Sequence, residues 1–186
     1  DPAGDYWSWR PPMPSTSRLA MAAASAGGKL YVIGGDAAGP RATNEEFDPA
    51  AGAWTTRAPM PTARFYLAAA GLGGKVYAIG GYDGGDLVQN EAYDPATDSW
   101  ETKAALPSGR SGPAAAVVNG KIYVVGGNNG VVKDTNFEYD PAANGWVTKS
   151  SMTAARWYLG AAAVGGKVYA VGGNDGGVVT DVEGYD

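Results

Sequence analysis

The chain has 186 residues, of which 45% are hydrophobic and 18% charged, so it can bury a core and does not resemble a disordered tail. Its net charge of −5 lacks the basic surplus typical of nucleic-acid binders, and we expect contact neither with nucleic acid nor with anionic membranes. Cysteine and histidine are both absent, which excludes disulfides and removes the commonest general base and metal ligand.

The chain opens with Asp1-Pro2 and reaches Trp7 six residues after Asp1. Proline presets φ and aspartate can bond the backbone beyond it, so this spacing predicts a turn followed by a β-strand. Because the chain begins with Asp1 rather than Met, and no signal peptide is recognisable, we expect a processed, excised or engineered product. The longest apolar runs, such as Ala20–Ala24, are too short to cross a bilayer.

A repeat of 46 residues organises the rest of the chain, because several residue types recur in one register. Glycine pairs, each at the end of an apolar run such as KVYAIGG, begin at Gly34, Gly80, Gly126 and Gly172. Aromatic–Asp steps end at Asp48, Asp94, Asp140 and Asp186, and a Trp follows the first three of them at Trp54, Trp100 and Trp146. An arginine recurs at Arg18, Arg64, Arg110 and Arg156.

Each repeat predicts four short strands, which the second repeat illustrates. Phe65–Gly71 is small and apolar, as expected of a strand buried on both faces near a central axis. Lys75–Ile79 is β-branched and aromatic and ends at the glycine pair. Asn90–Tyr93 forms the third strand, an Asp-Pro turn follows, and the fourth strand carries Trp100. No stretch has a helical period, so we expect an all-β fold of radially repeated sheets.

The glycine pair, the Tyr before the Asp and the spaced Trp resemble the marks of the kelch repeat, and the resemblance covers the whole chain. It implies a β-propeller of four blades, each a four-stranded antiparallel sheet. We expect a single domain over residues 1–186, with repeats at about 13–58, 60–104 and 106–150 and a fourth made of 152–186 plus 1–10. The repeated Gly and Trp residues are interpreted as structural, the glycines for positive φ and the Trp rings for packing.

The two ends of the sequence predict how the ring closes. Asp1 to Trp7 has the spacing of a fourth strand, whereas the last repeat stops at Asp186, where a third strand finishes. We therefore expect the N-terminal strand to close the last blade and to cover its open edge. A four-bladed ring within one chain is favoured as a monomer, because inner strands such as Ala68–Ala70 are poor in bulk. The alternatives are a homodimer that forms an eight-bladed ring, or four repeats cut from a longer propeller or designed.

Two sets of residues are predicted to meet at one mouth of the central channel: Arg18, Arg64, Arg110 and Arg156, and the residues directly after the glycine pairs, Asp36, Tyr82, Asn128 and Asn174. In BTB-kelch substrate adaptors, to which the chain is similar, matching residues line the face that grips short acidic peptides. The resemblance implies a similar face here, because guanidinium groups bind carboxylates in a bidentate manner. Alternatively, the arginines bond carbonyls of a neighbouring blade or pair with loop acids.

Repeats two and four carry aromatic pairs after the arginine, Phe65-Tyr66 and Trp157-Tyr158, which pack between blades or anchor a partner or a sugar. The absence of His and Cys excludes the copper and iron chemistry of some kelch enzymes and also His-dependent nucleophilic triads. We expect no catalytic residues, metals or cofactors. The predicted function is a non-catalytic module that binds a protein or acidic peptide. The alternatives are a structural or engineered propeller without a ligand and, more distantly, a carbohydrate-processing enzyme.

Overall fold

The computed structural model describes residues 4–15 and 17–186, and within them the regular structure is entirely β. The strands form four antiparallel sheets in chain order. The first sheet contains β1 (Ala22–Ala26), β2 (Lys29–Ile33), β3 (Asn44–Asp48) and β4 (Ala53–Arg57). The second contains β5 (Ala68–Leu72), β6 (Lys75–Ile79), β7 (Asn90–Asp94) and β8 (Ser99–Thr102). The third contains β9 (Ala114–Val118), β10 (Lys121–Val125), β11 (Asn136–Asp140) and β12 (Gly145–Lys149), and the fourth contains β13 (Gly160–Val164), β14 (Lys167–Asn174) and β15 (Val178–Tyr185).

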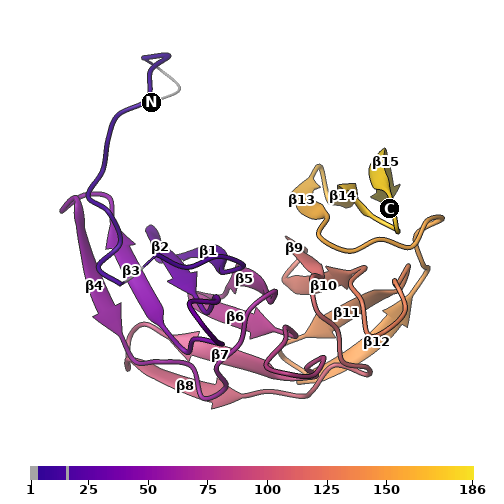
Figure 1. Ribbon diagram of the computed structural model, residues 1–186, viewed down its shortest axis with the longest axis horizontal. Helices are drawn as coiled ribbons and strands as arrows, with labels where there is room; N and C mark the ends of the chain where they lie inside the picture. Colours follow the sequence, from indigo (N-terminus) through magenta and orange to yellow (C-terminus); the bar gives the residue numbers. More distant parts are fainter. Residues whose placement is uncertain (1–3, 16) are drawn as a thin grey trace.

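The sheets are the blades of a four-bladed β-propeller, with their first strands innermost (Figure 1). β1 packs beside β5, β5 beside β9, and β9 beside β13. Figure 1 shows the blades as an arc whose two ends, at β1–β4 and at β13–β15, stand apart. Among the described residues, no strand of blade 4 packs on blade 1 as the successive blades pack on one another.

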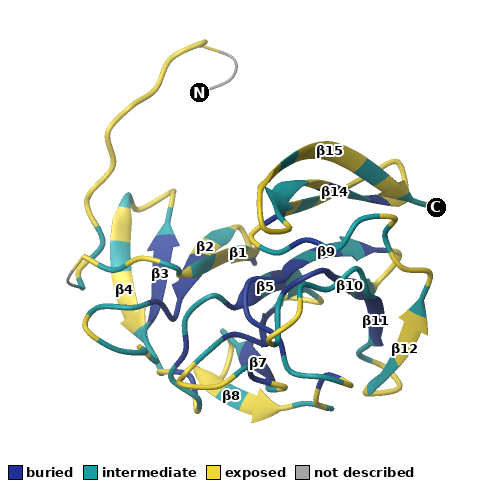
Figure 2. Ribbon diagram, turned by 45° about the vertical axis from the view of Figure 1, so that its right-hand side comes forward, coloured by how far each residue is buried: buried dark blue, intermediate teal, exposed yellow. Residues whose placement is uncertain are grey.

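The core lies between neighbouring blades, because each sheet is apolar on both faces near the axis. Ile33 of blade 1 meets Val76 of blade 2, and Ile79 of blade 2 meets Ile122 of blade 3. The middle strands β3, β7 and β11 are buried, whereas the outer strands β4, β8 and β12 are largely exposed (Figure 2). Burial in each complete blade is therefore greatest in the third strand and lowest in the outer strand, which no further strand covers.

The glycine pair is required by the close contact between blades. Gly80 has φ +64°, and a Cβ there would lie 2.8 Å from the carbonyl oxygen of Arg110 in the next blade. Gly81 donates its N–H to the same carbonyl at 2.9 Å. A side chain at Gly80 would both strain the backbone and displace this contact, which explains why the pair recurs.

The repeated tryptophans pack as the sequence predicts. The Trp100 indole lies 5.2 Å from the Tyr93 ring between centroids, and its Nε1–H donates to the Ala58 carbonyl in the segment that leads from blade 1 to blade 2 at 2.8 Å. Trp146 repeats both contacts, with Tyr139 and with the Ala104 carbonyl. Each of these fourth-strand residues thus fixes its blade to the connection before it.

In the second repeat, the strand limits agree with the sequence to within one residue, except at the start of the inner strand. The expected second strand, Lys75–Ile79, is β6 without change. The expected inner strand began at Phe65, whereas β5 begins at Ala68, because Tyr66 has φ +53° and therefore cannot continue an extended strand.

The fourth blade corrects one expectation. It has three strands, in the order β13-β14-β15, and residues 4–15 form no strand with it. Instead, the Trp54 indole donates to the Pro11 carbonyl at 2.8 Å, which holds the N-terminal segment against the outside of blade 1. From there the segment extends beyond the β4 end of the arc and does not reach blade 4 (Figure 1). The expected closure of the last blade by residues 1–10 of the same chain is therefore not formed by residues 4–10, and residues 1–3 lie outside the described part.

Among the described residues, no helix exists that could cross a membrane.

Candidate functional site

Within each blade, the segment that carries the arginine lies beside the residue that follows the glycine pair. The residue after each arginine forms an isolated antiparallel β-bridge with the residue after the glycine pair. These bridges are Leu19–Asp36, Phe65–Tyr82, Ser111–Asn128 and Trp157–Asn174. We call this end of the axis the mouth. Here residues 18–20, 64–66, 110–112 and 156–158 meet the loops 36–40, 82–86, 128–132 and 174–178.

The arginine side chains turn away from the mouth, which corrects the expected ring of guanidinium groups. Arg64, Arg110 and Arg156 are fully buried, and the Arg18 side chain is 1% exposed. A glutamate of the third strand pairs with three of them: Glu45 with Arg18, Glu91 with Arg64, and Glu183 with Arg156. All four guanidinium groups are buried and three are paired with carboxylates, so they are not presented to an anion at the mouth, and the alternative structural interpretation of these residues fits the geometry.

The Arg64 pair illustrates the cost of this arrangement. Its Nη2 lies 2.7 Å from Oε2 of Glu91 and 3.2 Å from the Ala78 carbonyl oxygen, and Thr62 donates to the other carboxylate oxygen at 2.6 Å. Burial lowers the pKa of Arg64 from its usual value, and the Glu91 charge opposes that shift. A buried ion pair of this kind is destabilised strongly when one partner is lost.

The third blade departs from the pattern because Phe137 stands where the other blades have glutamate. Arg110 donates instead to the Gly126 carbonyl at 3.0 Å, to Thr135 at 2.9 Å and to Ser108 at 3.1 Å. Burial without a paired carboxylate lowers the pKa of Arg110 to about 10.

The residues after the glycine pairs shape the loops of the mouth. Asp36, Asn128 and Asn174 each accept a backbone N–H from their own loop through Oδ1, with Gly39, Gly130 and Gly176 as donors. Tyr82 has no such acceptor and places its ring 5.5 Å from the Phe65 ring between centroids. Three members of this predicted set therefore order loops, and only the fourth adds to an aromatic surface.

That surface is a continuous aromatic band made of Phe65, Tyr66, Tyr82, Trp157 and Tyr158. Trp157 stacks on Tyr158 with 3.9 Å between centroids, and Tyr158 lies 4.8 Å from Tyr66. Tyr158 reaches Tyr66 across blade 3 because Gly112 leaves room: a Cβ there would lie 2.8 Å from its ring. The rings are half-buried, and Tyr158 is 44% exposed, so the band faces solvent. Burial and a hydrogen bond with Tyr66 raise the pKa of Tyr158.

The backbone under the band is strained. Tyr66 and Tyr158 both have φ +53°, a left-handed conformation that costs a residue with a side chain roughly 1–2 kcal/mol. Gly112 occupies the same register position with φ +61° and avoids that cost. The sequence missed this feature, although a Gly at 112 in register with two tyrosines is the signal that could have revealed it.

The charged groups in the mouth loops are mainly acidic. Asp36, Asp83, Asp86 and Asp175 lie in these loops, and Arg41 and Lys133 lie just beyond them. With the guanidinium groups of the arginine quartet buried, the electrostatic field at the mouth is therefore set by carboxylates rather than by arginine.

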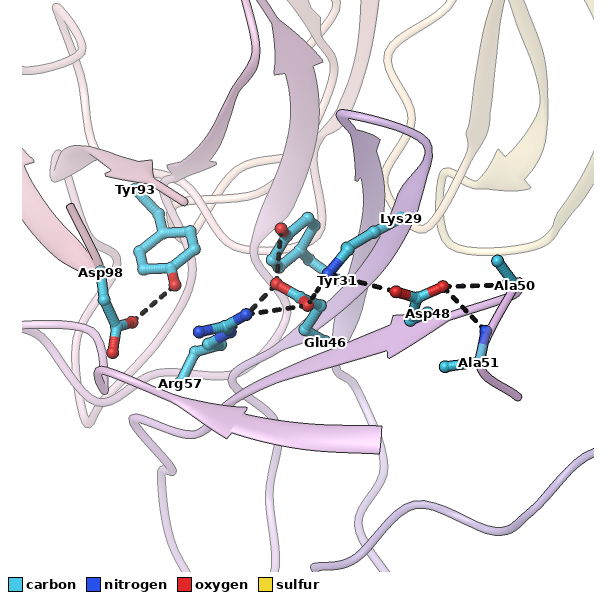
Figure 3. Close-up of polar contacts among 9 residues, drawn as sticks. All are labelled: Lys29, Tyr31, Glu46, Asp48, Ala50, Ala51, Arg57, Tyr93 and Asp98. Atoms are coloured by element: carbon cyan, nitrogen blue, oxygen red, sulfur yellow. Dashed lines mark hydrogen bonds and ion pairs between the residues drawn. The ribbon is translucent and has the colours of Figure 1, made fainter. Parts of the chain in front are cut away.

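A second polar cluster lies outside the mouth, between β2 and β4 (Figure 3). The buried Glu46 carboxylate accepts from Lys29 at 2.6 Å, from the Tyr31 hydroxyl at 2.8 Å and from two Arg57 nitrogens at 3.0 Å. Burial favours the protonated form, but the bonds from Arg57, Lys29 and Tyr31 outweigh it and lower the pKa of Glu46 to about 2. Each carboxylate oxygen is occupied, so the cluster is suited to holding strands together rather than to proton transfer.

The described residues contain no group of three or more Asp or Glu side chains placed to hold a metal ion. What the structure does define is a repeat propeller with inter-blade glycine pairs, buried arginines and a loop face at one end of its axis. The family model described as the KLHDC2/KLHL20/DRC7 Kelch-repeats domain matches residues 6–173, and the chain belongs to the kelch-repeat family. No curated protein matches it. Kelch propellers are in general protein-interaction modules and are generally not enzymes.

Proposed function

We propose that this protein binds a segment of another protein, or a peptide, at the mouth, and that the aromatic band is the contact surface. The observation that carries the proposal is the pair Tyr66 and Tyr158, which occupy a strained backbone position that Gly112 takes freely. Strain is retained where the resulting side-chain placement is useful, and here it brings two rings together on an exposed face.

The chemistry of the mouth indicates the ligand. Aromatic faces attract cations, and nearby carboxylates strengthen that preference. The four aspartates of the loops therefore favour a segment with a basic side chain beside an apolar or aromatic one. The earlier expectation of an acidic peptide rested on the arginine quartet, and the burial of those side chains removes its basis.

A selection from a random peptide library displayed on phage tests this function. The native chain is the bait, and the double variant Tyr66→Gly, Tyr158→Gly is the counter-bait. Glycine suits φ near +53°, so this variant removes the rings without adding backbone strain. We expect enriched peptides to combine Arg or Lys with an aromatic residue and to bind the double variant at least about 10-fold more weakly.

The matched control is Val147→Ser, which changes an exposed apolar residue of the outer strand β12, outside the mouth. Its affinity for the selected peptides should equal that of the native chain. A selection that yields no peptide able to distinguish native chain from double variant overturns the proposal and leaves a structural propeller without a ligand at this face.

A further inference from the structure

The outward face of blade 4 is apolar and uncovered. Val171 lies at the position that Ile33, Ile79 and Val125 occupy in the other blades. Those three side chains are at most 2% exposed because the next blade packs on them, whereas Val171 is 46% exposed. Val178 and Val182 of β15 are also exposed, and Figure 2 shows β15 exposed along most of its length.

The opposite face, on blade 1, has the matching feature. Leu30 lies at the position of Val76, Ile122 and Val168, which are buried against the preceding blade. Leu30 itself is 36% exposed, and Met21 is exposed where Leu67 and Leu159 are buried. At the first two junctions, residues of the Val171 type share a buried apolar cluster with residues of the Leu30 type, namely Ile33 with Val76 and Ile79 with Ile122, so the two uncovered faces are complementary.

A backbone ladder across the blades ends at the same two faces. Tyr158 donates to the Gly112 carbonyl at 2.9 Å, Gly112 to Tyr66 at 2.8 Å, and Tyr66 to Ala20 at 2.8 Å. Within the described residues, the N–H of Ala20 and the carbonyl of Tyr158 make no further bond of this ladder. The ladder therefore offers a donor on the blade 1 face and an acceptor on the blade 4 face.

A cavity of about 420 Å³ marks where a fourth strand belongs in blade 4. Ser150 and Tyr185 line it, and they correspond to Ala104 and Tyr139, the two groups that Trp146 contacts in blade 3. A Trp indole placed in this cavity would reach the Ser150 carbonyl and the Tyr185 ring. The cavity thus matches a β-strand that carries a tryptophan.

The N-terminal segment carries such a residue but is held at the other end of the arc. Trp7 is fully exposed, and its spacing from Asp1-Pro2 is that of Trp100 from Asp94-Pro95. The bond from Trp54 to the Pro11 carbonyl holds the base of this segment on blade 1, as Ala58 is held in front of blade 2. It is therefore placed to complete whichever blade stands in front of blade 1.

We propose that two copies of this chain join head to tail, each presenting blade 4 to blade 1 of the other, and close a ring of eight blades. In this arrangement the partner's Leu30 covers Val171, and the backbone ladder continues from one copy to the other. The partner's N-terminal segment pairs with β15 and places its tryptophan in the cavity. The same junction occurs twice around a twofold axis, so neither apolar face nor strand edge stays open.

Disulfide trapping tests the proposal on the whole chain, which has no native cysteine. By register with blade 2, where Ala92 pairs with Glu101, Ser8 of one copy should lie opposite Gly184 of the other. An equal mixture of the single variants Ser8→Cys and Gly184→Cys should form a covalent heterodimer on mild oxidation, and neither variant alone should form one. Light scattering on the native chain should give twice 19.0 kDa.

Trp7→Ala should weaken dimerisation at least about 10-fold, since a central tryptophan dominates interfaces of this kind. Val131→Ser, an exposed apolar change away from both faces, should leave it unchanged. The double variant Ser8→Cys, Gly184→Cys separates the alternatives within one molecule. A cross-linked monomer would mean that the N-terminal segment completes blade 4 of the same molecule and would overturn the two-copy ring. A native mass of 19.0 kDa, or a mass above that of a dimer, would also overturn it.

Discussion

The guanidinium carbon of Arg110 lies 4.3 Å from the centroid of the Phe137 ring. In the other three blades a glutamate occupies the register position of Phe137 and pairs with the equivalent arginine. Blade 3 therefore holds a buried arginine by ring contact and neutral acceptors, while its neighbours use an ion pair. The protein therefore allows two ways of holding a buried arginine, with and without a paired carboxylate, to be compared in one molecule.

Replacing Glu91 with Gln should destabilise the protein by about 3–5 kcal/mol, because Arg64 would remain buried without its counter-charge. Chemical denaturation at neutral pH measures the change. Glu101→Gln is the matched control, since Glu101 pairs with Lys103 at the surface and its loss should cost less than about 1 kcal/mol. Equal effects of the two variants would show that the Arg64–Glu91 pair contributes nothing beyond a surface pair.

The reverse change, Phe137→Glu, should destabilise the protein by about 1–3 kcal/mol, because Phe137 belongs to a buried apolar cluster, and losing its packing and burying a carboxylate cost more than pairing with Arg110 gains. The new carboxylate would lie beside Arg110 and within reach of Ser108, as Glu91 lies beside Arg64 and Thr62. Denaturation of the variant beside the native chain provides the measurement. A gain of stability would contradict this expectation and show that pairing with Arg110 outweighs both costs.

The strand order within each repeat and the positive φ of the glycine pairs could be predicted from the sequence, because each depends on residues within one repeat. The direction of the arginine side chains could not, since it is set by a glutamate 27 residues later in the third strand. The recurrence of Glu45, Glu91 and Glu183 is the sequence signal for that pairing. This recurrence predicts a buried Arg–Glu pair only when the pairing of β6 with β7, which places Glu91 inside the blade, is known.

The position of the N-terminal segment could not be predicted from the sequence, for a different reason. Its spacing identifies a fourth-strand pattern, but the same strand pairing closes a blade within one chain or between two. The bond between Trp54 and the Pro11 carbonyl, which fixes the segment on blade 1, depends on tertiary contacts that the repeat does not encode. The aromatic band was anticipated only as two pairs, Phe65-Tyr66 and Trp157-Tyr158, and its continuity requires the space above Gly112.

Acid should remove the stabilisation provided by Glu46. Its pKa in the folded state is about 2, below the value near 4.5 of an unperturbed glutamate. A lowered folded-state pKa means that the contribution is complete above pH 4.5 and is lost as the pH falls through about 2. Glu46→Gln should cost about 2–3 kcal/mol at pH 7, and its difference from the native chain should shrink steadily below pH 4.5.

Denaturant titrations of both proteins from pH 7 to pH 2 measure that difference. Glu101→Gln, at an exposed position, serves as the control for general effects of acid on the fold. A gap between Glu46→Gln and the native chain that stays constant over this range would contradict the assignment of the low pKa to Glu46.

The tryptophans of the fourth strands should be packing residues. Trp100→Ala should cost about 3 kcal/mol, near the lower end for a large aromatic, because the indole is half-buried against Tyr93. Trp146→Ala should behave alike, since its contacts with Tyr139 and the Ala104 carbonyl repeat those of Trp100. Chemical denaturation measures both variants, and a change near zero in either would show that the ring does not support the junction between blades.

Trp100→Phe separates the two contributions of the indole. Phenylalanine retains an aromatic ring for the contact with Tyr93 but cannot donate to the Ala58 carbonyl. The variant should therefore lose about 1 kcal/mol, the net value of one hydrogen bond, rather than the full cost of the alanine change. A loss as large as that of Trp100→Ala would mean that the bond to the segment between blades, and not the ring contact, holds the fourth strand in place.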